Sequence, residues 1–172
     1  MENLLLNPPV VEYLEQNTGF GTWRRFMHVN GEMFAEFKSH GTLFGLPLLH
    51  ITWGRCPETM RRITAKGIIA IGRFAFGGLA IGQVSGGVIA IGQLGIGLLF
   101  GFGQATSGLV AVGQLAIGGL IGVGQFACGH MAIGQFGLGS YVLAQFGIGD
   151  HVWDMRQGDP VAVQFFRQLL FK

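Results

Sequence analysis

The sequence predicts a mainly β protein: a four-sided, right-handed β-solenoid of five-residue repeats, with a small mixed N-terminal cap and a C-terminal capping helix. Residues 67–149 repeat a five-residue unit, as in Gly92-Gln-Leu-Gly-Ile and Gly113-Gln-Leu-Ala-Ile. Between Arg73 and Asp150 no side chain carries a formal charge. Glycine accounts for 31 of the 172 residues, without the Gly-X-Y period of collagen. Such repeats indicate a solenoid, because each unit buries its core against its neighbours.

Residues 1–66 predict a small α/β cap that holds most of the charged side chains. Residues 9–16 are typical of a short helix that begins at a Pro-Pro pair. Residues 25–29 and 32–37 predict a hairpin, because the Asn30-Gly31 pair between them suits a type I′ turn. Residues 42–53 predict a further extended apolar segment, which leads towards the repeats.

The five-residue period of residues 67–149 favours short strands over helices. On an α-helix it would advance about 140° per unit and spread the large residues over all faces. Four units would form a square turn of about 20 residues, with turns stacked at about 4.8 Å. The period slips to six at Gly97 and again at Gly118, four units apart. Both extra residues would then fall on the same side of adjacent turns, which predicts about four turns in all.

Residues 150–172 predict a polar connector and a final helix. Asp159 and Pro160 form an N-cap and first-turn pair, so we expect a helix over residues 161–171. Its apolar residues recur at helical spacing, which predicts that one face closes the open end of the array.

Glutamines at the second position of alternate units are the candidate interaction residues. On a square turn they would occupy two opposite sides and could form ladders of amide hydrogen bonds along the stack. An alternative is that they only solvate the turns. The candidate residues are Gln83, Gln93, Gln104, Gln114, Gln125, Gln135 and Gln145.

The repeat unit resembles that of pentapeptide-repeat proteins over about half of the chain. That resemblance implies inward-pointing glycine, outward-pointing glutamine and inward-pointing large residues at Leu94, Leu115, Phe126 and Phe136. It also implies that the isoleucines of the last position point outward, whereas the alternation in Leu-Ala-Ile would turn both large residues inward. Two further motifs resemble an uncharacterised group of bacterial glycine-rich repeat proteins: Phe-Gly-Leu-Pro-Leu-Leu-His-Ile and Ala-Lys-Gly-Ile-Ile-Ala-Ile-Gly. This resemblance implies no function.

A bundle of transmembrane helices is the rival fold. The uncharged stretch is long enough for three or four spans of about 20 residues, and the basic residues from Arg55 to Arg73 could flank them. Glycine is a poor helix former, however, and a glutamine about every ten residues would place one or two in each span. We therefore expect the solenoid.

The sequence contains no catalytic, cofactor-binding or metal-binding motif, so we expect no enzyme activity and no cofactor. Cys128 and His130 lack a second pair of ligands nearby. The net charge of +2 and the lack of a long basic run argue against nucleic acid as a partner. Cys56 and Cys128 form no disulfide framework, and the first residues do not resemble a secretory signal.

The sequence therefore predicts a non-enzymatic structural or scaffold protein that self-associates, or contacts a membrane, through uncharged solenoid faces. The expected partner is a second copy of the chain, in a homo-oligomer or filament, with membrane lipid as a further partner. The alternative is an integral membrane protein whose glycine-rich array is embedded in the bilayer. The expected location is cytoplasmic or membrane-associated.

Overall fold

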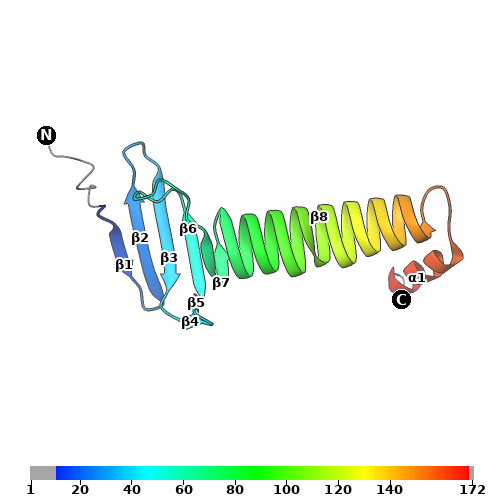
Figure 1. Ribbon diagram of the computed structural model, residues 1–172, viewed down its shortest axis with the longest axis horizontal. Helices are drawn as coiled ribbons and strands as arrows, with labels where there is room; N and C mark the ends of the chain where they lie inside the picture. The colour runs from blue at the N-terminus through cyan, green and yellow to red at the C-terminus, as the bar shows by residue number, and fades with distance from the viewer. Residues whose placement is uncertain (1–10, 171–172) are drawn as a thin grey trace.

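The computed structural model describes residues 11–170 and is mainly β, with one short helix at its C-terminal end. A small sheet at one end leads into a long coil, and the helix folds back beside the last turns (Figure 1). The mainly β class and the C-terminal helix were both predicted from the sequence.

Three antiparallel strands begin the sheet: β1 (Leu14–Asn17), β2 (Gly21–Met27) and β3 (Met33–Ser39). The predicted hairpin of residues 25–37 is confirmed, but its loop spans residues 28–32 and Gly31 is its only residue with a positive φ, 82°. It is therefore not a type I′ turn, which needs two such residues. The predicted helix over residues 9–16 is wrong where it is described: Leu14 to Gln16 pair with β2, and pairing outweighs helix propensity. Residues 9 and 10 lie outside the described residues.

The sheet changes from antiparallel to parallel pairing before the repeats begin. Strand β6 (Leu49–Trp53) pairs antiparallel with β3 and parallel with β7 (Ala65–Ile71). With β8 (Phe74–Trp153) the order is β1-β2-β3-β6-β7-β8. A separate two-stranded ribbon, β4 (Thr42–Leu43) and β5 (Leu46–Pro47), precedes β6. One edge of β6 thus pairs with β7, which begins the first turn of the coil.

The repeats form one continuous strand, β8 (Phe74–Trp153), that winds as a coil (Figure 1). Residues of β7 pair with residues ten positions later in β8, as in Ala65 with Ala75 and Ile71 with Ile81. The predicted turn of four units and about 20 residues is therefore wrong, because one turn contains two units. Each unit begins with a glycine, except the unit that begins at Ala144, and the glycines of alternate units form two columns along the coil. The first column is Gly72, Gly82, Gly92, Gly103, Gly113, Gly124 and Gly134, and the second is Gly67, Gly77, Gly87, Gly97, Gly108, Gly118, Gly129, Gly139 and Gly149.

The interior of the coil is filled by small side chains from the fourth position of each unit. A ten-residue turn brings its two sides so close that only one short side chain from each fits between them. At Gly137, for example, an added Cβ would lie 2.5 Å from Cγ1 of Val142 on the opposite side, so glycine faces the larger valine. The buried residues include Ala65, Ala70, Ala75, Ala80, Ser85, Ala90, Gly95, Gly101, Thr106, Ala111, Ala116, Gly122, Ala127, Ala132, Gly137, Val142, Gly147 and Val152.

The two six-residue slips lie on the same side of the coil, as predicted, but not in adjacent turns. Each runs from a second-column glycine to the next first-column glycine, from Gly97 to Gly103 and from Gly118 to Gly124. With a ten-residue turn, one regular turn separates them. The two extra residues therefore cannot stack directly on each other.

One buried hydroxyl in the described part of the coil has no hydrogen-bond partner, the Oγ1 of Thr106. We expect Thr106→Val to stabilise the protein by about 1 kcal/mol, because it removes an unsatisfied buried polar group and keeps the shape of the side chain. The midpoint of urea unfolding measures the change. Ser85→Ala is the matched control, since the Ser85 hydroxyl donates to the Leu94 carbonyl at 3.5 Å and its removal should give no such gain.

The last turn of the coil is closed by side chains that replace a further strand. The Gly147 N–H donates to Asp154 Oδ2 at 3.1 Å, and Arg156 Nη2 donates to the Gly147 carbonyl at 2.8 Å. Arg156 also pairs with Asp154 at 2.6 Å. The Arg156 guanidinium, then the Gly147 N–H, hold the pKa of the Asp154 carboxyl well below its usual range. The open edge of the sheet is thus covered at this position.

The final helix, α1 (Pro160–Leu170), begins as predicted from the sequence. Asp159 Oδ1 accepts hydrogen bonds from the backbone N–H of Val161 at 2.7 Å and of Ala162 at 3.4 Å. The helix was predicted to close the open end of the array. It lies instead against the side of the last turns, where Ala162 and Phe166 are fully buried.

Candidate interaction surface

The large side chains of the coil point outward. Leu94 and Leu115 are each 45% exposed, Phe126 is 55% exposed and Phe136 is 47% exposed. The prediction that these residues point inward is wrong, because the narrow interior has room only for the small fourth-position residues. The isoleucines of the last position are exposed or half-buried. Ile117, for example, points outward and is 51% exposed. The sequence allowed two registers, and neither of them placed both large residues of a unit on the outer surface of the coil.

One side of the coil, face A, is a flat apolar sheet surface. It comprises the outward residues between a first-column and the next second-column glycine. Phe126, Phe136 and Phe146 stack on it with ring centroids 5.0 and 5.6 Å apart. Beside this stack lies an apolar groove of about 450 Å³, which ends at Arg156. The exposed members of face A are Phe74, Phe76, Leu94, Ile96, Leu115, Ile117, Phe126, Phe136, Leu138, Phe146 and Ile148.

The opposite side, face B, is apolar as well but is partly covered. Its outward residues lie between a second-column and the next first-column glycine. Helix α1 packs on its C-terminal part, where Phe165 stacks on Tyr141 at 4.4 Å between ring centroids. The rest of the face remains open, and its exposed large residues are Ile69, Val88, Ile89, Leu98, Leu99, Phe102, Leu109 and Leu120.

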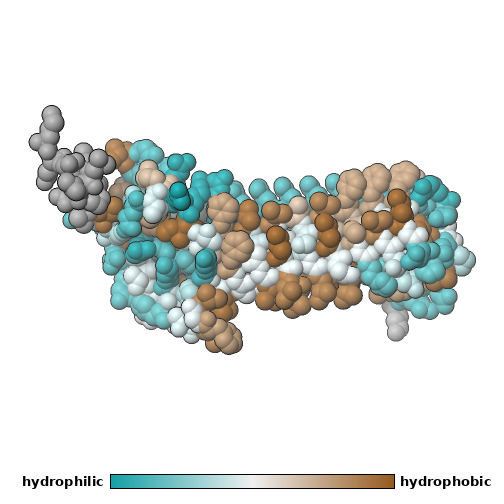
Figure 2. Space-filling model, viewed as in Figure 1, coloured by the Kyte–Doolittle hydropathy of each residue, from teal (hydrophilic) through white to brown (hydrophobic). Residues whose placement is uncertain are grey.

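The seven candidate glutamines form a single column along one edge of the coil, which we call the glutamine edge. Six of the seven follow a first-column glycine, these glycines lie directly on one another in successive turns, and Gln145 follows Ala144. All seven side chains are exposed. The predicted distribution over two opposite sides is wrong, because glutamines of alternate units are one full turn apart. Figure 2 shows brown patches along the coil, teal at its two ends and a short teal row along part of its upper edge.

Among residues 11–170, no hydrogen bond links one of these glutamine amides to another side chain. The predicted ladder of amide hydrogen bonds within one chain therefore stays a prediction. What the fold provides is a column of free donors and acceptors, repeated once per turn.

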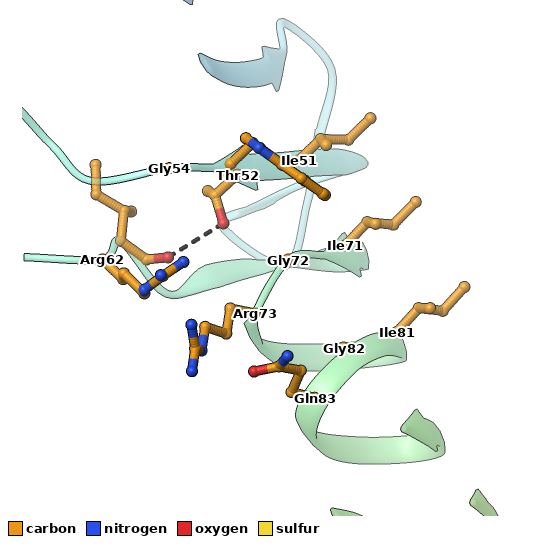
Figure 3. Close-up of a pocket in the computed structure, with 12 residues that line it drawn as sticks. Ile51, Thr52, Gly54, Arg62, Ile71, Gly72, Arg73, Ile81, Gly82 and Gln83 are labelled. Atoms are coloured by element: carbon orange, nitrogen blue, oxygen red, sulfur yellow. Dashed lines mark hydrogen bonds between the residues drawn. The ribbon is translucent and has the colours of Figure 1, made fainter. Parts of the chain in front are cut away.

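Where the N-terminal sheet meets the coil, a cavity of about 470 Å³ is lined by both apolar and basic residues. Figure 3 shows Ile51, Ile71 and Ile81 stacked and pointing the same way, while Arg73 and Gln83 point to the other side. Both Arg62 and Arg73 line the cavity and are exposed. Within the described residues neither forms an ion pair. This end of the coil therefore presents positive charge that anionic groups can approach.

A buried carboxylate, Glu36, organises the sheet next to this cavity. Its Oε1 accepts hydrogen bonds from Lys38 at 2.9 Å and from His50 Nε2 at 3.1 Å, and its Oε2 pairs with Arg24. Burial opposes ionisation of Glu36, but the hydrogen bonds from His50, Arg24 and Lys38 outweigh it and hold the pKa of the carboxyl far below its usual range. His50 Nδ1 accepts the Lys66 N–H at 2.9 Å, so the cluster also ties β6 to the first turn of the coil.

The Cys and His residues of the coil do not come together as a metal site in the described part of the chain. In residues 11–170 no group of three or more His, Cys, Asp or Glu residues is placed to hold a metal ion. Cys128 lies on face A and His130 packs against Tyr141 at 5.6 Å between ring centroids. His151 contacts Asp159 at 3.2 Å, next to the start of α1. Each of these residues thus has a role in packing or in side-chain contacts of the fold.

Comparisons with known proteins give no further guide, because no family model, curated protein or solved structure matches the chain. Within the described residues, no helix has the length and apolar character needed to cross a membrane.

Proposed function

We propose that the protein is a non-enzymatic structural protein whose coil is a β-solenoid of two-unit turns that inserts into a lipid bilayer through its uncharged faces. The observation that carries this proposal is the exposure of large apolar side chains on both faces, at 36–71% for the exposed members of face A. Apolar surface on this scale, extending along the coil, marks a membrane or assembly surface rather than a surface kept in water.

The length of the uncharged part supports a spanning arrangement. Between Arg73 and Asp150 the coil makes between seven and eight turns. At roughly 4.8 Å per turn this is about 36 Å, compared with about 30 Å for the hydrocarbon core of a bilayer. A moderate tilt accommodates the difference. Most charged residues then lie at the two ends, where water and lipid headgroups meet them, and Arg167 lies on α1 beside the last turns.

The hydrogen bonds of the coil also suit a bilayer. A spanning segment must satisfy its backbone polar groups internally. Neighbouring turns pair in parallel, as in the hydrogen bond from Val84 N–H to the Arg73 carbonyl at 3.0 Å. These bonds run along the coil axis, so the open sheet edges of the described coil lie at its two ends. Those ends would lie outside the hydrocarbon.

Self-association in water is the second candidate function. The flat face A and its groove beside the phenylalanine stack favour it, because two such faces could pack together as sheets do. Both faces would then need partners, which leads to layered assemblies.

The test uses the full chain mixed with phosphatidylcholine and phosphatidylglycerol vesicles. We expect the protein to float with the vesicles and to stay with them after a wash at pH 11. In polarised infrared spectra of oriented bilayers, the amide I transition should align with the membrane normal, because the carbonyl groups lie along the coil axis. Protein left in the aqueous phase, or removed by the alkaline wash, would contradict insertion. An in-plane amide I transition would contradict a spanning coil.

The basic end should favour anionic lipid. We expect Arg62→Gln/Arg73→Gln to remove a preference for phosphatidylglycerol vesicles worth about 1 kcal/mol per arginine, because each guanidinium lies near the headgroups. Partition measured against pure phosphatidylcholine vesicles should not change. Arg167→Gln, on α1 at the other end, is the control for the loss of one positive charge; an equal effect per arginine there would point to net charge alone.

A further inference from the structure

The glutamine edge conflicts with a coil surrounded entirely by lipid. Its seven amides are exposed, and in residues 11–170 they have no hydrogen-bond partner among the side chains. An amide placed in hydrocarbon without a partner is costly, and polar residues inside a membrane usually face protein or water. If the coil spans the bilayer, something other than lipid must therefore cover this edge.

We propose that the glutamine edge is the contact between two parallel copies of this chain within the bilayer. The inference rests on the proposed membrane insertion of the coil. An amide donates and accepts hydrogen bonds, so a column of amides is complementary to a second copy of itself. A two-fold axis parallel to the coils would place equivalent glutamines of the two copies at the same height, once per turn.

The glycines beside the column make this contact close. Each of the seven glutamines except Gln145 follows a glycine, and at that position Ala144 is nearly as small. Small residues at an interface in a membrane let two backbones approach and let short polar side chains reach across. The glutamine edge thus combines two features of such an interface, small residues and hydrogen-bonding side chains.

The opposite edge of the coil does not combine small residues with a column of hydrogen-bonding side chains, so it serves as an internal comparison. It carries Val88, Leu98 and Leu109, and its large polar residues, His130 and Asp150, lie towards the C-terminal end. Leu109 lies about half a turn from both Gln104 and Gln114, so it is at the same depth. In the proposed arrangement this edge faces lipid.

The first experiment places a photoreactive benzophenone side chain at position 114 or at position 109 of the full chain in phosphatidylcholine and phosphatidylglycerol vesicles. We expect position 114 to form cross-links between two copies and position 109 to form adducts with lipid. Position 83 should cross-link to the equivalent region of the second copy. A cross-link from position 83 to the region of Gln145 would overturn the parallel arrangement.

The second experiment measures energy transfer between labelled copies in the same vesicles. We expect Gln104→Leu/Gln114→Leu/Gln125→Leu to raise the dissociation constant of the pair at least about tenfold, because each copy loses three hydrogen-bonding groups. Leu98→Ala/Leu109→Ala should leave it within about twofold. Circular dichroism and vesicle flotation of each variant show whether the coil is still folded and inserted.

The outcomes separate the two proposals. Protein that does not enter the vesicles defeats the proposed function and this inference with it. Protein that enters but gives only lipid or water adducts at position 114, or pairs equally well after the triple glutamine change, overturns the glutamine contact alone.

Discussion

Gly134→Ala should unfold much of the coil, at a cost of about 3 kcal/mol or more. A Cβ at this position would overlap the carbonyl oxygen of Gly124 in the preceding turn. That oxygen belongs to the backbone and cannot rotate away, so relief would require separation of two paired turns. Urea unfolding followed by circular dichroism measures the loss.

Gly119→Ala is the matched control. The nearest atom to an added Cβ there is Cδ2 of Leu109 at 3.4 Å, an ordinary contact with a flexible side chain. We expect a change within about 0.5 kcal/mol, because the site is exposed and the nearest backbone atoms lie 3.8 Å from the added methyl, an ordinary contact. Equal losses for both variants would show that glycine acts here through chain entropy and not through the close approach of turns.

Glu36→Ala should destabilise the protein by about 3 kcal/mol, because it removes the shared partner of three side chains. The buried His50 Nε2–H would lose its acceptor, whereas Arg24 and Lys38 can reach water. Unfolding by urea at neutral pH measures this change. Glu15→Ala, on the exposed strand β1, is the control and should change little.

The same carboxylate gives a testable pH dependence. Its pKa in the folded protein lies below the value of about 4.3 expected for an unfolded chain. Its contribution is therefore complete above about pH 4.3 and is lost as the pH falls towards the folded pKa. Glu36→Gln should flatten the decline in stability below pH 5 relative to the natural protein. An unchanged acid decline in the variant would mean that other carboxyl groups account for it.

Much of the fold could be predicted from local sequence signals. Asp159 and Pro160 located the start of α1 because an N-cap acts within one turn of helix. The hairpin of residues 25–37 was found because glycine at position 31 permits the reversal. The mainly β character of residues 67–149 followed from the period of five. Each of these signals depends on residues close together in the chain.

The size of the turn was missed because a five-residue period fits several numbers of units per turn. A second signal was present: the glutamines recur about every ten residues, and so do Phe126, Phe136 and Phe146. That longer period was the turn itself. The direction of the large residues was missed for a related reason. The fourth position of the unit is almost always Ala, Gly, Ser or Thr, which is what a narrow interior requires.

The candidate surface was predicted in part. The glutamines were singled out correctly as an exposed set, but their gathering into one column depends on the turn length. The Glu36 cluster was not predicted, because Arg24, Glu36 and His50 lie on three strands and meet only through sheet register. No local pattern in the sequence links them.

The parallel pairing of β6 with β7 has a consequence for the order in which the chain acquires its structure during synthesis. Each turn of the coil needs only the exposed edge of the turn before it, and β6 supplies the first such edge. Contacts about ten residues apart close quickly, and a repeat array can grow from one nucleated end. We therefore expect winding to follow the ribosome from the N-terminal side, with only the newest turn unpaired at any moment. The segment at residues 154–158 follows the last turn and ends the winding by occupying the edge that a further turn would use.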